Sequence, residues 1–146
     1  MSVYAMKTAL SLFVAFFAFV TVSFAQNGVA AFAKETHDFG KIEQGKPVTY
    51  VFAFKNTGTE PVVITDAQAS CGCTKPTWSK EPVAPGQTGQ VSATFNAAGM
   101  GPFTKTVTVT SNAKTSMVYL TLKGEVVSKE AAEAAAQTSA KKKGTK

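Results

Sequence analysis

The chain contains no arginine, although its lysines give it a formal net charge of +6. Arginine is the usual bidentate ligand of phosphates and base edges, because its planar guanidinium presents a fork of donors. The lysines are also unevenly placed. Residues 26–127 carry nine lysines against seven acidic residues, whereas residues 128–146 carry five lysines against two. This distribution gives no support for nucleic-acid binding, and it leaves the run at 141–143 as a solvated tail or, alternatively, a tether to an anionic surface.

Residue types that usually carry chemistry are also scarce. The sequence has one histidine, one tryptophan and two cysteines. It has no glycine-rich phosphate loop, no paired carboxylates and no acidic spacing typical of a calcium loop. We therefore expect no enzyme activity and no cofactor.

Between residues 26 and 127 no apolar run has the period of a helix, which excludes the crossover helices that parallel α/β folds require. The apolar residues alternate instead, as strands require, and turn residues separate the runs. One such face is formed by Val48, Tyr50, Phe52 and Phe54, and later faces by Val91, Ala93 and Phe95, by Val107 and Val109, and by Val118, Leu120 and Leu122. Strands are also expected at residues 36–39 and 62–65. The pattern predicts an all-β antiparallel sandwich of about seven strands.

The first 25 residues have the layout of a secretory signal peptide. Lys7 supplies the positive start, residues 9–22 are apolar, and Ser23-Phe24-Ala25 offers a cleavage site with small residues before Gln26. A retained membrane anchor is the less favoured alternative, because a spanning helix needs about 20 apolar residues. We expect export to the periplasm or the extracellular space, with no membrane span after cleavage.

The expected organisation has four parts. They are a signal peptide (1–25), a short linker (26–34), a sandwich domain (35–127) and an Ala- and Lys-rich tail (128–146). The tail has no apolar stripe that could dock, so we expect it to be largely disordered, with at most a short frayed helix over 130–137.

The most specific local feature is the motif Cys71-Gly72-Cys73. In an oxidising compartment the two thiols are expected to form a disulfide that fixes the loop, and glycine between them relieves backbone strain. The loop closed is very small, so a labile, redox-active bridge is a second interpretation. A third is a soft-metal site, although a closed zinc site needs four ligands.

Two further residues have competing interpretations. Trp78 either covers the cysteine loop or the end of the sandwich, which we favour, or is an exposed binding aromatic together with Gly72 and Thr74. His37 is expected to be a solvated or hydrogen-bonded strand residue. It could act as a ligand or base only if the fold brings it to the cysteines.

An ordered set of motifs carries a family resemblance over residues 37–125. The set consists of His37-Asp38-Phe39-Gly40, Gly45, the strand and turn at 52–58, Ser70-Cys71-Gly72-Cys73-Thr74, Val83-Ala84-Pro85-Gly86, Gly101 and Ser111-Asn112. In this order they resemble the bacterial family called domain of unknown function 1573. The resemblance implies an immunoglobulin-like fold of the Hydin and major-sperm-protein type and a place in the cell envelope. It assigns no catalytic residue.

These observations favour an exported, non-catalytic binding or structural module whose partner is a protein or another envelope component. The expected contact surface is the end of the sandwich at residues 71–78. A thiol-redox or soft-metal-handling protein that uses Cys71 and Cys73 is the alternative. A carbohydrate-binding sandwich is a second alternative, which rests on Trp78 and on analogy of fold.

Overall fold

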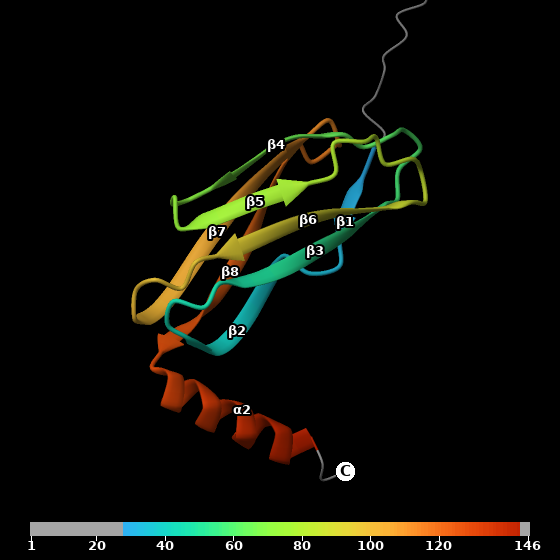
Figure 1. Cartoon of the computed structure of the whole chain (residues 1–146). Helices are drawn as coiled ribbons and strands as arrows, with labels where there is room; N and C mark the ends of the chain where they lie inside the picture. Colours follow the sequence, from blue (N-terminus) through green and yellow to red (C-terminus); the bar gives the residue numbers. More distant parts are fainter. Residues whose placement is uncertain (1–27, 144–146) are drawn as a thin grey trace, which may run out of the picture.

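The computed structural model describes residues 28–143, with side chains to residue 137. Eight strands form two facing sheets, and one helix follows them (Figure 1). The elements are β1 (Ala30–Phe32), β2 (Thr36–Glu43), β3 (Val48–Asn56), β4 (Ile64–Ala69), β5 (Thr74–Trp78), β6 (Thr88–Phe95), β7 (Gly101–Ser111), β8 (Met117–Val127) and α2 (Lys129–Lys143). The predicted signal peptide lies outside the described residues.

The first sheet has the strand order β1-β3-β6-β5 and the second the order β2-β8-β7-β4. All neighbouring strands are antiparallel except β2 and β8, which run parallel, so the expectation of a purely antiparallel sandwich is corrected at this pair. In an immunoglobulin domain of the constant type, the strand orders are ABED and GFC. The first sheet reproduces ABED, and β8-β7-β4 reproduces GFC with β2 added at the edge. The fold is therefore the immunoglobulin-like β-sandwich that the sequence predicted.

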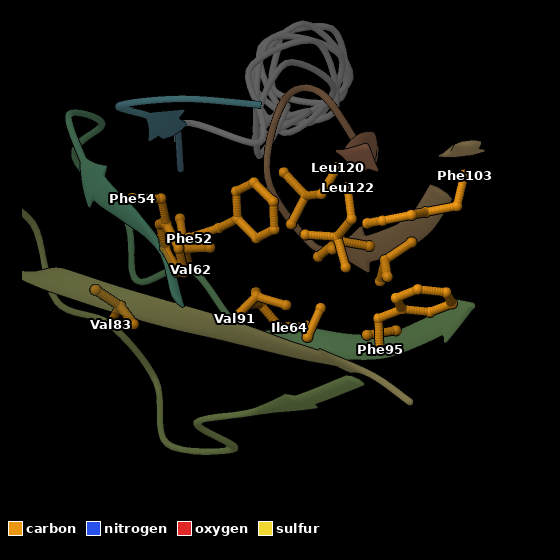
Figure 2. Packing of buried hydrophobic residues seen from close by; sticks show 14 of the residues in the cluster. Phe52, Phe54, Val62, Ile64, Val83, Val91, Phe95, Phe103, Leu120 and Leu122 are labelled. Carbon is orange, nitrogen blue, oxygen red and sulfur yellow. The ribbon is translucent and has the colours of Figure 1, made fainter. Parts of the chain in front are cut away.

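The core lies between the sheets and is built from the alternating residues of each strand (Figure 2). Phe52 and Phe54 of β3 are each 1% exposed, and Leu120 and Leu122 of β8 are fully buried. Because burying one such side chain stabilises a fold by about 1.5–3 kcal/mol, these faces fix the register of their strands. The inward faces predicted for residues 48–54, 91–95, 107–109 and 118–122 are confirmed, with partial exposure of Val48, Tyr50 and Val118.

The chain enters the sandwich earlier than predicted. Residues 30–32, assigned to a linker, form β1 and pair with residues 54–56 of β3. The run is too short and too rich in alanine to show a strand period. The chain then changes sheets, and β2 extends to Glu43 rather than ending at Gly40, because a bulge between Asp38 and Lys41 absorbs the glycine.

The middle of the chain also differs from the prediction. The strand expected at 62–65 begins at Ile64 and continues to Ala69, while Val62 only bridges to Val83. Residues 74–78, interpreted as part of a loop, form β5. Pro76 hid this strand in the sequence, because proline is tolerated in a sheet mainly at an edge, and β5 is an edge strand.

The tail forms the helix α2 instead of the largely disordered segment we expected. Ser128 caps it, since the N–H of Ala131 donates to the Ser128 hydroxyl at 3.4 Å. Glu130 lies in the first turn, where the helix dipole favours an acidic residue. The sequence is rich in alanine, glutamate and lysine, which have high helix propensity. The half-buried alanines at 131, 132 and 135 share one side, and α2 contacts β2.

Candidate functional site

The cysteine motif lies where the chain passes from β4, at the edge of one sheet, to β5, at the edge of the other. Hydrogen bonds hold the segment at both ends. Ser70 N donates to Thr106 O at 2.8 Å, and Thr106 N donates to the Ser70 hydroxyl at 3.2 Å. At the other end Asn96 N donates to Cys73 O at 3.0 Å. The motif is thus fixed between two sheets.

Cys71 and Cys73 are joined by a disulfide, and their Cα atoms are 5.2 Å apart. The neighbouring Thr74 is only 4% exposed. Its hydroxyl lies 3.9 Å from the sulfur of each cysteine, within hydrogen-bonding distance for sulfur. Among the described residues, no group of three His, Cys, Asp or Glu side chains could hold a metal ion.

The residues proposed as one binding loop occupy different environments. Gly72 is exposed, Thr74 is buried and Trp78 is half-buried on β5. The indole N–H of Trp78 donates to the carbonyl of Ile64 at 3.2 Å, which ties the edge strands of the two sheets together. Trp78 therefore covers this side of the sandwich. Part of Trp78 is still exposed and lines a hollow with Thr77 and Ser92, so the carbohydrate hypothesis stays a prediction.

His37 lies on β2, an edge strand at the side of the second sheet opposite β4. Its ring stacks on Tyr50 with centroids 3.6 Å apart and contacts the edge of Phe39 at 4.5 Å. Partial burial is the main cause that lowers the pKa of His37 below 6.5. Lys34 lowers it further, and Asp38 acts in the opposite direction. The fold does not join His37 and the cysteines into a Cys–His pair.

A shallow hollow of about 350 Å³ lies over the bulge of β2. Its charged lining includes Asp38 and Lys123, whose side chains form an exposed ion pair at 3.5 Å. The N–H of Gly40 donates to Asp38 at 2.8 Å and is the main cause of a lowered pKa for this carboxyl. The hollow is open, so it offers no enclosed place for a substrate.

The free edges of the two sheets are protected to different degrees against pairing with a further strand. On β5, Asn96 N donates to Cys73 O just before the ladder with β6, so odd-numbered residues of β5 bond to β6. Pro76 is even-numbered, and its missing N–H lies on the open side. On β4, the outward N–H of Ala67 is already bonded to Asp66 Oδ1 at 2.9 Å. The bulge and charges of β2 disfavour pairing there.

The edge of β3 has no such protection. Asn56 N donates to Gln87 O, so even-numbered residues of β3 bond to β6 and odd-numbered residues face the other side. On that side β1 pairs only with residues 54–56. The backbone groups of Thr49 and Val51 therefore have no partner strand among the described residues, and the Val51 side chain is 45% exposed. The sequence pattern could not reveal this edge, since only the order of strands defines it.

No helix among residues 28–143 is long and apolar enough to cross a membrane.

Searches against known proteins are consistent with the fold. No curated protein matches the chain in sequence. A protein of unknown function from Porphyromonas gingivalis W83 matches in structure with a TM-score of 0.62 and 16% identity, over 74% of this chain. The chain spans 51% of that protein.

A second match is the ASH/PapD-like domain 7 of human CEP192, with a TM-score of 0.59, 12% identity and coverage of 75% of this chain and 93% of that domain. The secreted serine protease VesC of Vibrio cholerae matches with a TM-score of 0.52 and 15% identity, over 69% of this chain but only 23% of the protease. At these identities the likeness concerns the fold alone. The family model of a protein of unknown function, DUF1573, matches residues 30–126, and the chain therefore belongs to the DUF1573 family, here with an immunoglobulin-like fold.

Proposed function

We propose that this chain is an exported, non-catalytic binding or structural module of the bacterial cell envelope. The signal-peptide pattern of residues 1–25 supports export. The open, shallow hollow over the bulge of β2 supports binding rather than turnover, because an active site needs convergent polar groups in a concave pocket. Immunoglobulin-like domains commonly act through their edges and loops.

The observation that carries this proposal is the open edge, defined as residues 48–52 of β3. Thr49 and Val51 each present an N–H and a C=O outward. No proline or charged side chain lies within this stretch, unlike the edge strands β2, β4 and β5. A partner that adds an extended segment here would satisfy these four backbone groups.

The expected partner is a protein segment in extended conformation. Val51 is apolar and Thr49 is β-branched, and both side chains lie on the outer face of the sheet. Cross-strand pairs of β-branched and apolar residues stabilise a sheet by about 0.2–1 kcal/mol each. We therefore expect a segment with β-branched or aromatic residues opposite Val51.

A backbone variant tests the open edge. Val51→Pro removes one outward N–H without removing a hydrogen bond to β6, whereas Val51→Thr keeps the N–H and serves as the matched control. The mature wild-type protein and both variants are used as bait in envelope extract. We expect the wild type and Val51→Thr to recover the same partner and Val51→Pro to lose it, with all three folded by circular dichroism. Equal recovery by all three, or no partner with the wild type, would contradict the proposal.

Export has its own test. The mass of the protein isolated from the envelope fraction is expected to correspond to a chain that begins at Gln26. A protein that retains residues 1–25, or that stays with the cytosolic fraction, would rule out the predicted cleavage.

A further inference from the structure

The Cys71–Cys73 disulfide contributes little to the fixed position of its loop. Backbone hydrogen bonds from Ser70 to Thr106 and from Asn96 to Cys73 hold both ends without it. The ring that the bond closes contains only residues 71–73, and the entropy gained from a cross-link falls as the closed loop shortens. The bond can therefore open while the sandwich stays folded.

The two sulfur atoms differ in their surroundings. Both cysteines are half-buried, but Cys73 packs against the hydrophobic core, whereas Cys71 is not part of that cluster. Gly72 between them is exposed, and a Cβ placed on it would meet no atom within 4 Å. This open space beside Gly72 lets an incoming thiol approach the bond, and Cys71 is the cysteine that lies outside the core cluster.

The buried hydroxyl of Thr74 is placed to assist the opening of this bond. Its hydrogen-bond partners among the described residues are the two sulfur atoms, each at 3.9 Å. A disulfide sulfur is a weak acceptor, whereas a thiolate is a charged and much stronger one. The hydroxyl therefore gains its best acceptor only when the bond is broken.

From these three features we propose that Cys71–Cys73 is a thiol–disulfide exchange site whose substrates are thiols. A thiolate attacks Cys71 Sγ, forms a mixed disulfide, and releases Cys73 as the thiolate that Thr74 stabilises. A second thiol then attacks the sulfur of the first substrate. The products are the dithiol form of the protein and one substrate disulfide, so two electrons pass from two thiols to the protein bond. The exchange is stoichiometric and is independent of strand addition at the open edge.

The first test is an equilibrium measurement on the mature protein. The protein is equilibrated with mixtures of reduced and oxidised glutathione, quenched with acid and analysed by mass. We expect the reduced fraction to rise smoothly with the proportion of reduced glutathione while circular dichroism shows an unchanged fold. A protein that stays fully oxidised in excess reduced glutathione, and becomes reduced only when unfolded, would overturn the proposal.

The role of Thr74 is tested by Thr74→Val, which keeps the shape and removes the hydroxyl. We expect this variant to need about tenfold more reduced glutathione for half reduction, because a hydrogen bond to a charged group is lost. Thr77→Val, on the exposed face of the same strand, is the control and is expected to titrate like the wild type. Equal titration of Thr74→Val and wild type would contradict the assigned role.

Single-cysteine variants test the order of attack and the source of the thiol. Cys73→Ser leaves Cys71 as the reacting thiol and is expected to form a mixed disulfide with oxidised glutathione faster than Cys71→Ser; the reverse order would contradict the assigned attack. Exchange of the wild type with a cysteine-containing peptide in place of glutathione distinguishes protein thiols from small ones. Reaction with either supports the site, and reaction with neither excludes it. Val51→Pro is expected to exchange normally, so this site and the open edge can fail separately.

Discussion

Asn56 is a buried amide at the end of β3 whose four hydrogen bonds join separate segments of the chain. Its oxygen accepts from the N–H of Val29 at 3.4 Å and of Gly58 at 3.0 Å. Its nitrogen donates to the carbonyls of Glu60 and Val83, each at 2.8 Å. Asn56 is fully buried, and its bond to Val83 is buried, whereas its other three bonds are partly buried.

We predict that Asn56→Ala lowers the free energy of unfolding by about 3 kcal/mol, because buried donors and acceptors are left without partners. Asn112→Ala is the control. That residue makes similar bonds to the backbone of Pro61 and Val63 but is exposed, so water replaces them and the expected loss is about 1 kcal/mol. Urea denaturation measures both values, and equal losses would contradict the assigned role of burial.

His37 is a second residue whose role can be tested, because the pKa of a single histidine can be measured directly. Burial lowers the pKa of His37, with Lys34 acting in the same direction. The folded protein therefore binds fewer protons than the unfolded chain near pH 6.5, and stability decreases as the pH falls through that range.

We expect the C2–H signal of His37 in an NMR titration to report a pKa below 6.5. Lys34→Gln is expected to raise this pKa, because it removes a nearby positive charge, whereas Lys55→Gln should leave it unchanged. A pKa at or above the ordinary value in the wild type would show that the ring does not lie against Tyr50 as described.

At the scale of strands, close packing fixes where side chains can be added. Gly89 of β6 lies against the ring of Phe54 on β3, which is 1% exposed. A Cβ on Gly89 would overlap this ring and would come within 2.8 Å of Val83. The ring belongs to the buried core cluster.

We predict that Gly89→Ala lowers the free energy of unfolding by about 2–3 kcal/mol through overpacking. Gly99→Ala is the matched control, because a Cβ there meets no atom within 4 Å, and a change below about 0.5 kcal/mol is expected for such a surface position. Thermal or chemical denaturation of the pair measures the difference, and a Gly89→Ala protein as stable as Gly99→Ala would show that Gly89 packs less closely against Phe54 and Val83 than described.

The strands also show how much of the fold could be predicted from the sequence. Long strands with alternating faces, such as those containing Phe52 and Leu120, were predicted because burial of one face imposes a period of two. The short strand at Ala30–Phe32 and the edge strand containing Pro76 were missed. The first is too short to show alternation and the second contains a proline, so only pairing with neighbours makes them strands.

The candidate sites likewise divide into those that the sequence could predict and those that it could not. Cys71 and Cys73 were recognised from spacing alone, because a disulfide between alternate residues is a local property. The role of Trp78 depended on Ile64, which belongs to the opposite sheet. The open edge at Thr49 and Val51 depends on the change of sheets between β1 and β2. Contacts between distant segments, rather than residue types, decide such features.

At the scale of the whole molecule, the sandwich is held by its core rather than by its disulfide. For a closed loop of three residues, the chain-entropy relation gives a stabilisation of about 1.6 kcal/mol. We therefore predict that Cys71→Ser with Cys73→Ser leaves a cooperatively folded protein that loses about this amount. Urea denaturation with and without reductant measures it. Loss of cooperative unfolding in the double variant would assign the bond a structural role instead.

The central claim concerns the open edge of β3, and amide hydrogen exchange tests it most directly. In the isolated mature protein, the amides of Tyr50 and Phe52 bond to β6 and are expected to be protected. Those of Thr49 and Val51 face solvent and should exchange much faster. Comparable protection of all four amides would mean that another segment or a second copy already covers this edge, and the proposed binding site would be contradicted.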